Sequence, residues 1–306
     1  METARYGRAL GLLPGRFSCR ALANPSQNYM VLHGHKNAVL EVQWTADGSQ
    51  LLSCSADKVR TRHSPAIPRW ALTLLAQTVR AWDAGTGQSV KKMGEHTGIV
   101  NSVCAARRGT PLLVSGSDDG TARLWDLRVR RCVQKFGEVP GSFPVTCVAL
   151  GAGSETLFAG GVDNLLRAWD LRTGQLSLTL EGHGDTVTGC ALSPDGSFLL
   201  SNAMDNTLRV WDVRPFAPTQ RCVKVLTAHA HNFEKLLLRC SWSADGSKVS
   251  CGSADRMLYV WGADGALQYK LPGHKGSVNE AVFHPQEPIV ASCSSDQTIY
   301  LGELAA

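Results

Sequence analysis

An all-β fold built from a repeated unit of short strands is predicted by three observations along the 306-residue chain. Tryptophan recurs at intervals of 42 to 50 residues, and an aspartate stands six residues before most of these tryptophans. Between these marks, short apolar or alternating runs are divided by turn-forming residues, which is the pattern of short strands joined by tight turns. The pairs are Asp119 and Trp125, Asp163 and Trp169, Asp205 and Trp211, and Asp255 and Trp261, with Trp82 preceding them.

Residues 181–214 show the unit most clearly. The segment opens with Gly182-His183 and closes with Trp211-Asp212, so that the tryptophan lies 28 positions after the histidine. Two turn signals, Pro-Asp-Gly and Asp-Asn, divide the apolar residues between them into three short strands. The expected strands are Val187–Leu192, Phe198–Ser201 and Thr207–Trp211.

A period of about 40 to 45 residues with Gly-His and Trp-Asp marks is the signature of WD40 propeller blades. The sequence therefore resembles the WD-repeat family, and the predicted fold is an all-β WD40 β-propeller with six recognisable blades. Each blade hides its apolar face against the next, because one blade alone cannot bury both of its faces. The resemblance implies seven blades, so we expect the first blade to be missing.

In the WD-repeat family a histidine, a strand hydroxyl, the turn aspartate and the tryptophan form a hydrogen-bonded chain within a blade. The resemblance implies this structural network at matching positions here. Three sets are complete and the last blade lacks only the tryptophan: His35, Ser53, Asp57 and Trp82; His96, Ser115, Asp119 and Trp125; His183, Ser201, Asp205 and Trp211; His274, Ser292 and Asp296. Blade three has Ala159 at the hydroxyl position and no histidine; blade five has Cys251, with His231 as a loose candidate. Recurrence in successive blades favours a structural role over a catalytic histidine–aspartate pair.

Composition indicates a globular chain with a sizeable core, since 43% of residues are hydrophobic and 19% are charged. No apolar run approaches the roughly 18 residues of a membrane span. The ten cysteines form no Cys-x-x-Cys pair. Buried, reduced thiols in a cytosolic or nuclear protein are therefore favoured over disulfides or zinc ligands.

The formal net charge of +5 does not predict nucleic-acid binding, because of where the charge lies. Residues 1–30 contain four arginines and one glutamate, and residues 59–77 contain three arginines and no acid. The remainder of the chain is close to neutral, so no basic stripe of the kind that binds phosphates is expected. Arg107-Arg108-Gly109 is interpreted as a solvated turn, with an RNA contact as the alternative.

We predict a propeller over residues 28–306, preceded by a disordered or mispredicted tail at 1–27, for which a transit peptide is the alternative. In blade one the His35–Trp82 spacing is 47 positions instead of about 28. Removing residues 59–77 restores the repeat, so this segment is interpreted as a foreign insert, either a retained intron or a true insertion. Tyr29–Leu32 is a candidate strand for closing the ring against the last blade.

The residues between the marks resemble a more specific group. Strings such as DVRPFAP at 212–218 and HNFEK at 231–235 are similar to the WD-repeat family found in the U5 small nuclear ribonucleoprotein, a component of the spliceosome. The resemblance implies a nuclear, non-catalytic scaffold of pre-mRNA splicing that docks spliceosomal proteins of the U5 particle, notably its largest core subunit. It implies no cofactor, no membrane, no small-molecule substrate, and RNA contact only through other proteins.

Five residues are partner-binding candidates, because exposed aromatic residues dominate protein interfaces. We expect them in one long connection between blades four and five: Arg214, Phe216, His231, Phe233 and Lys235. In the alternative interpretation Phe216 packs onto its own blade.

Two other function classes remain open. One is a WD40 adaptor in another complex, for example in substrate recruitment for ubiquitin ligation, and the other is direct RNA binding. The sequence contains no P-loop, no nucleophile elbow and no metal-spaced cluster of histidine and cysteine, which disfavours an enzyme.

Overall fold

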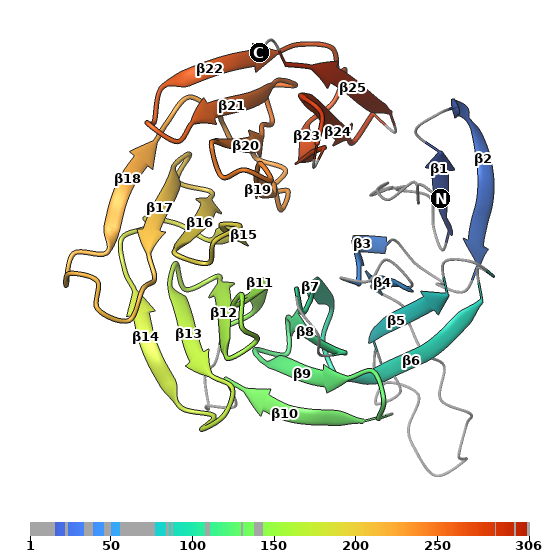
Figure 1. Ribbon diagram of the computed structural model, residues 1–306, viewed down its shortest axis with the longest axis vertical. Coiled ribbons are helices and arrows are strands. Elements are labelled where there is room, and N and C mark those ends of the chain that lie inside the picture. The colour runs from blue at the N-terminus through green and yellow to red at the C-terminus, as the bar shows by residue number, and fades with distance from the viewer. Residues whose placement is uncertain are drawn as a thin grey trace. The chain divides into compact units, whose positions relative to one another are not determined.

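The protein was analysed as a computed structural model, which describes residues 16–21, 24–33, 39–45, 50–55, 77–83, 86, 88–107, 111–129, 131–137, 143–284, 286–296 and 298–304. Throughout these ranges the chain forms strands, turns and bends, without a helix (Figure 1). It divides into two compact units, Met1–Val145 and Thr146–Ala306, which are described separately.

The first unit contains a two-stranded sheet and two four-stranded sheets, all antiparallel. β1 pairs with β2, and the next two sheets have the strand orders β3-β4-β5-β6 and β7-β8-β9-β10. The strands are β1 (Arg16–Ala21), β2 (Asn24–His33), β3 (Val39–Trp44), β4 (Gln50–Ser55), β5 (Gln77–Asp83), β6 (Ser89–His96), β7 (Val100–Ala105), β8 (Leu112–Ser117), β9 (Ala122–Asp126) and β10 (Cys132–Phe136).

The second unit contains three four-stranded sheets and one three-stranded sheet, again antiparallel and with strands in chain order. Within this unit the first strand of each sheet lies on the inner side and the fourth on the outer side (Figure 1). The strands are β11 (Val145–Leu150), β12 (Thr156–Gly161), β13 (Leu166–Asp170), β14 (Leu176–Leu180), β15 (Val187–Leu192), β16 (Phe198–Ala203), β17 (Leu208–Asp212), β18 (Cys222–Leu226), β19 (Cys240–Trp242), β20 (Lys248–Gly252), β21 (Leu258–Gly262), β22 (Leu267–Leu271), β23 (Val278–Phe283), β24 (Ile289–Ser294) and β25 (Ile299–Glu303).

Burial follows the position of a strand in its sheet. Every residue of β9, the third strand, is buried, whereas β10 at the outer edge alternates between half-buried and exposed until Phe136. A strand that is covered on both faces is continuously apolar, and one that faces water on one side alternates. The predicted apolar runs therefore mark the first three strands of a sheet, as at β15, β16 and β17, and the fourth strand least.

Neighbouring sheets within a unit pack face to face. In the second unit Leu200 and Val210 of one sheet lie in a single apolar cluster with Tyr259 and Trp261 of the next. The two four-stranded sheets of the first unit meet through a similar cluster around Trp125. Each sheet thus completes the core of its neighbour, which is the reason that a single repeat is not stable alone.

Close approach of two sheets also explains one glycine. A Cβ atom built on Gly252 at the end of β20 would lie 2.1 Å from the carbonyl oxygen of Val278 in β23. No side chain fits at that distance, so glycine is required where the inner ends of these sheets meet.

Hydroxyl groups join the innermost strands of the second unit. Thr146 on β11 donates to the carbonyl of Val187, and Thr188 on β15 donates to the carbonyl of Leu238 at 2.9 Å. Ser241 on β19 continues the series by donating to the carbonyl of a residue on β23, at 2.7 Å. These bonds satisfy buried polar groups at the seam between sheets.

The predicted domain boundaries stay predictions. The insert proposed for residues 59–77 lies outside the described residues except for Gln77, with which β5 begins. On either side of it β4 and β5 pair directly, with Ser55 opposite Thr78. β1 and the start of β2 fall within the segment for which we predict a tail.

Two further observations concern the described residues alone. No helix among them has the length and apolarity needed to cross a membrane. Nine of their cysteines are free thiols, and burial raises the pKa of Cys251 well above its usual range. Such a thiol is inert at neutral pH.

Candidate functional site

The β7–β10 sheet of the first unit contains a complete hydrogen-bonded network. His96 Nδ1 lies 2.8 Å from Asp119 Oδ2, and His96 Nε2 lies 2.7 Å from Ser115 Oγ. Trp125 Nε1 donates to the same hydroxyl oxygen at 2.8 Å. The sequence had placed these four side chains at matching positions of the repeat, and the fold brings them together.

The network recurs elsewhere in the same geometry. His183 lies 3.0 Å from Asp205 and 2.7 Å from the hydroxyl of Ser201, which accepts a hydrogen bond from Trp211. In the last sheet His274 contacts Ser292 and Asp296, and the ring of Tyr300 packs edge-on against the histidine. Tyr300 lies opposite Ser292 on β25, whereas the tryptophan position is taken by Gly302. In the β3–β6 sheet Trp82 donates to Ser53, while His35 and Asp57 lie outside the described residues.

The donors and acceptors are consistent with one proton arrangement. The indole N–H donates to the serine oxygen, the serine hydroxyl donates to Nε2, and Nδ1–H donates to the aspartate, so the histidine is neutral. Burial lowers the pKa of His96, which favours this neutral form. Burial alone would raise the pKa of Asp119, but hydrogen bonds from His96, Thr121 and the Thr97 amide hold it well below its usual range.

Replacing Ser115 by alanine is expected to lower the free energy of unfolding by about 1–3 kcal/mol, because the indole N–H and the imidazole Nε2 lose their buried partner. Ser115 is fully buried, whereas Ser89 on β6 is exposed and provides the matched control. Urea denaturation of both variants measures the difference. Equal stability of the S115A and S89A variants would show that the network contributes nothing to folding.

Two sheets depart from this arrangement. In the sheet of β11–β14, Ala159 replaces the hydroxyl, and Asp163 forms an ion pair with Arg167 at 2.5 Å instead of with histidine. In the sheet of β19–β22, the phenol of Tyr259 donates to Asp255 at 2.6 Å. Both aspartates therefore keep a partner although the histidine is absent from its usual place.

His231 is not the residue that takes the histidine position in the sheet of β19–β22. His229 packs edge-on against Trp261 at 5.9 Å, as the network histidines do against their tryptophans. Its Nε2 lies 2.7 Å from the amide oxygen of Asn202 in the preceding sheet. The sequence offered His231 only as a loose candidate, because residue spacing does not show how the long connection before β19 folds.

The first candidate partner-binding segment is a hydrogen-bonded turn. Phe216 is fully exposed, so the alternative in which it packs onto its own sheet does not hold. Arg214 makes a two-pronged contact with Asp212, at 3.0 Å and 2.5 Å, and its guanidinium lies 5.7 Å from the centre of the Phe198 ring. The amide of Ala217 donates to the carbonyl of Arg214, closing a turn with Phe216 at its corner.

The second segment is a similar turn in a different place. Phe233 is 92% exposed. The amide of Lys235 donates to the carbonyl of Asn232, closing a turn around Phe233. The Asn232 side chain accepts a hydrogen bond from the amide of Glu234. His231 is half-buried, and its ring contacts Asn202 at 3.2 Å.

We had expected both segments in a single connection between sheets, but they belong to two different connections. β18 (Cys222–Leu226) separates them as the fourth strand of its sheet. Residues 213–221 join β17 to β18 inside one sheet, and residues 227–239 join that sheet to the next. The recognisable repeat ends at Trp211-Asp212, so the sequence pattern did not predict β18, the strand that follows.

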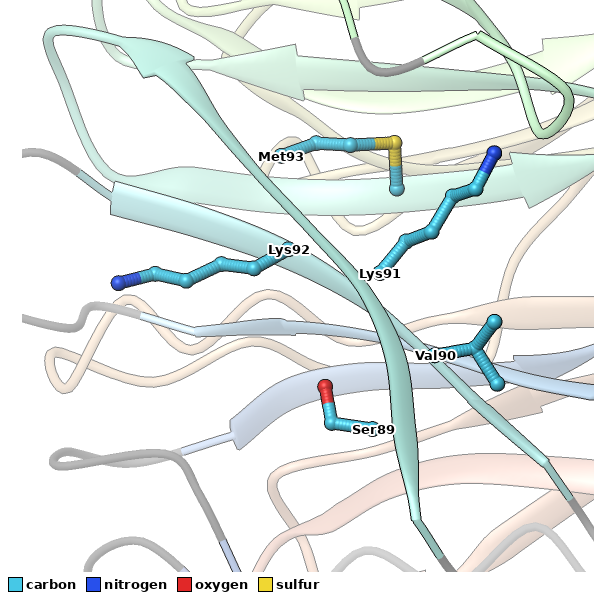
Figure 2. A pocket seen from close by; sticks show the side chains of 5 residues that line it. All are labelled: Ser89, Val90, Lys91, Lys92 and Met93. Atoms are coloured by element: carbon cyan, nitrogen blue, oxygen red, sulfur yellow. The ribbon is translucent and has the colours of Figure 1, made fainter.

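No small-molecule site is evident in the described part of the chain. Figure 2 shows a hollow lined by five consecutive residues of β6, from which Lys91 and Lys92 extend to opposite sides. Ligand sites are formed by polar groups that converge from several elements, which a single edge strand does not supply. The described residues likewise contain no group of three histidine, cysteine or acidic side chains placed to hold a metal ion.

Sequence reasoning missed the polar residues that join the sheets, although a signal exists. Valine followed by asparagine or threonine recurs at the start of four inner strands: Val100-Asn101, Val145-Thr146, Val187-Thr188 and Val278-Asn279. The corresponding residues before β19 are Leu238 and Arg239, and the Arg239 side chain donates to two carbonyls of neighbouring strands.

The sequence matches one family model, the WD domain, G-beta repeat. The matched segments are residues 26–59, 87–126, 130–170, 174–212, 220–262 and 265–301. With the antiparallel sheets described above, these six matches confirm the predicted all-β WD40 propeller fold with six recognisable repeats.

Several curated proteins are similar over most of the chain. The U5 small nuclear ribonucleoprotein 40 kDa protein of Dictyostelium discoideum is 46% identical over 279 residues, which cover 90% of this chain and 72% of that protein. The human protein of that name is 51% identical over 223 residues, covering 72% of this chain and 62% of its own. Pre-mRNA-splicing factor cwf17 of Schizosaccharomyces pombe is 41% identical over 278 residues, covering 91% and 75%. The chain therefore belongs to the WD40-repeat family, in the group that includes the U5 small nuclear ribonucleoprotein 40 kDa protein.

Proposed function

We propose that this chain is a non-catalytic protein-interaction scaffold of the U5 small nuclear ribonucleoprotein and acts in the nucleus in pre-mRNA splicing. The observation that carries the proposal is 46% identity to a U5 40 kDa protein across 90% of the chain. Similarity to a splicing factor over 91% of the chain supports it from a second relative. The proposed partners are the spliceosomal proteins of the particle, including its largest core subunit.

The geometry of the networks supports a scaffold rather than an enzyme. Serine, histidine and aspartate are also the groups of a hydrolase triad. Here Ser115 and Ser201 are fully buried, and each oxygen already accepts an indole hydrogen bond. A nucleophile must reach its substrate, so a sealed and repeated set is suited to holding strands in place.

The candidate contacts are the exposed turns. Phe216 and Phe233 are large apolar side chains that are almost fully exposed, and aromatic side chains of this kind become anchors when a partner buries them. Arg214 supplies a charged flank at the first turn, and His231 and Lys235 flank the second.

Affinity purification from nuclear extract with the full chain as bait tests the proposal. We expect U5 RNA and U5 proteins to be recovered together, with RNA recovery lost after protein partners are stripped. Recovery of a cullin-containing set without splicing proteins would overturn the proposal in favour of an adaptor for ubiquitin ligation. Salt-sensitive binding of bare RNA by the purified chain would instead favour direct RNA recognition.

A further inference from the structure

Two cysteines meet at the seam between the β11–β14 sheet and the β15–β18 sheet. Cys147 lies on β11, and Cys190 lies on β15 directly opposite Ser201 of β16. Opposite residues of an antiparallel pair project from the same face, so Cys190 lies on the face that carries Ser201 and its indole donor Trp211. Cys190 packs against the apolar cluster that contains both Trp211 and Cys147. This face of the β15–β18 sheet therefore points toward β11.

The two sulfur atoms are in hydrogen-bonding contact. The Cys190 thiol donates to the Cys147 sulfur, which together with burial raises the pKa of Cys190 well above its usual range. Burial alone would raise the pKa of Cys147 too, but the hydrogen bond from Cys190 and the positive charge of Arg239 lower it. The contact thus favours a pair in which Cys147 loses its proton first and Cys190 keeps the one that remains.

Hydrogen bonds hold the two strands together at the cysteines. Thr146, the residue before Cys147, donates to the carbonyl of Val187 on β15. The Arg239 guanidinium donates to the carbonyls of Thr146 at 3.1 Å and Thr188 at 2.9 Å, and so joins the same two strands again. A disulfide requires two backbones that already lie close together, because departures from its geometry store strain. These three bonds hold β11 and β15 side by side in that way.

The pair is reached from one side. Cys147 is 1% exposed, and a Cβ atom built on Gly160 of β12 would lie 2.8 Å from its sulfur, so the β12 side is closed. Cys190 is only half-buried. A small oxidant therefore contacts Cys190 first, with the more acidic Cys147 thiol directly behind it. Susceptibility to oxidation follows exposure and thiolate character, and the pair combines the two.

We propose that Cys147 and Cys190 are a redox modification site, which hydrogen peroxide converts reversibly into a disulfide joining β11 to β15. The Cys190 sulfur attacks one peroxide oxygen, the O–O bond breaks, hydroxide leaves, and the Cys190 proton passes to the ionised Cys147. The Cys147 sulfur then attacks the sulfenic acid at Cys190, the S–S bond forms, and the Cys147 proton leaves with the sulfenic hydroxyl as water. Peroxide is reduced by two electrons, which the two sulfurs supply.

The reduced pair is the resting state. Both thiols are free in the structure, and in a reducing compartment a cellular thiol returns the disulfide to this state by exchange. The disulfide closes residues 147–190 into a loop, which restricts the unfolded chain and stabilises the second unit. The site does not depend on the proposed scaffold function, because it is defined by the chemistry of the chain alone.

Peptide mapping of the full chain tests the proposal. Trypsin releases Cys147 in residues 136–167 and Cys190 in residues 173–209, and neither peptide contains a second cysteine. The reduced protein is treated with hydrogen peroxide, its remaining thiols are alkylated, and the digest is analysed by mass spectrometry without reductant. We expect the two peptides to be joined, with a mass lower by two hydrogen atoms than their sum, and to be separated again by dithiothreitol.

Cys132 provides the matched control, since it is a half-buried thiol that donates to the backbone carbonyls of Leu124 and Gln134. We expect Cys190 to lose its free thiol at least about tenfold faster than Cys132. Cys147→Ser should slow the loss at Cys190 to the rate of Cys132, because serine neither takes up the Cys190 proton nor closes a disulfide. Cys132→Ser should leave the yield of joined peptides unchanged.

Three results would overturn the site. They are oxidation of Cys190 no faster than that of Cys132, joining of Cys190 to a cysteine other than Cys147, and an unchanged rate at Cys190 in the C147S variant. Far-ultraviolet circular dichroism first checks that each variant is folded. Mapping of the parent chain needs no variant, so the proposal stays testable even where a serine variant does not fold.

Discussion

Replacing Arg239 by methionine is expected to lower the free energy of unfolding by about 2–4 kcal/mol. Arg239 is 8% exposed, and its Nη1 donates to the carbonyls of Thr146 at 3.1 Å and Thr188 at 2.9 Å. One guanidinium thus connects the inner strands β11 and β15 to the residue preceding β19. A charged donor contributes more to each buried carbonyl than a neutral one, and methionine fills most of the volume but donates nothing.

Urea denaturation followed by far-ultraviolet circular dichroism measures this loss. Arg172→Met is the matched control, since Arg172 is exposed in the turn between β13 and β14 and its replacement should change stability by less than about 0.5 kcal/mol. If the R239M variant is as stable as R172M, the guanidinium does not hold the inner strands together. A reduced denaturant slope without a change in midpoint would instead indicate an altered unfolded state.

The fold was predictable because its marks are local. The turn aspartates fold back on their own turn, as when Asp119 accepts a hydrogen bond from the Thr121 amide two residues later. The tryptophans are large and apolar, so Trp125 and Trp211 are buried wherever neighbouring sheets meet. Both effects depend on nearby sequence and on burial, and both recur with the repeat.

The outer strands and the polar seams were less predictable. β18 reads Cys-Val-Lys-Val-Leu, and an exposed outer strand of five residues gives too weak a pattern to stand out between two turn-rich segments. The two candidate partner-binding segments were consequently assigned to one connection. Asn202 and His229 are 27 positions apart, and their contact depends on how two sheets pack. Residue spacing within one repeat cannot predict a hydrogen bond between two repeats.

Stability is expected to fall by about 4 kcal/mol between pH 7 and pH 5 because of His229 and His231, the two histidines of residues 227–239. Burial, together with the nearby His231, lowers the pKa of His229 to about 4, and burial lowers the pKa of His231 to about 4. Asp205 opposes both shifts, since its negative charge favours the protonated rings. The rings are neutral in the folded protein throughout this range.

The sign of the effect follows from proton linkage. The unfolded chain takes up a proton on each histidine near pH 6.5, and the folded chain does so only near pH 4. The stabilisation is therefore complete above about pH 6.5 and declines as the pH falls toward 4, by about 1.4 kcal/mol per pH unit for each histidine. Asp205 adds nothing in this window, because its lowered pKa matters only below about pH 4.

Denaturation at half-unit steps from pH 7 to pH 5 measures the slope. The double variant His229→Gln, His231→Gln is expected to lose most of the decline, since glutamine keeps a polar side chain but does not titrate. Phe233→Ala, which changes the same loop without removing a titratable group, should retain the slope of the parent chain. If the free energy of unfolding declines equally in the double variant and the parent chain, the acid sensitivity arises elsewhere. In that case mild acid does not weaken the connection that contains Phe233. If the slope is lost as expected, mild acid should also weaken any partner contact at Phe233 more than one at Phe216, because His229 and His231 hold residues 227–239, whereas residues 213–221 contain no histidine.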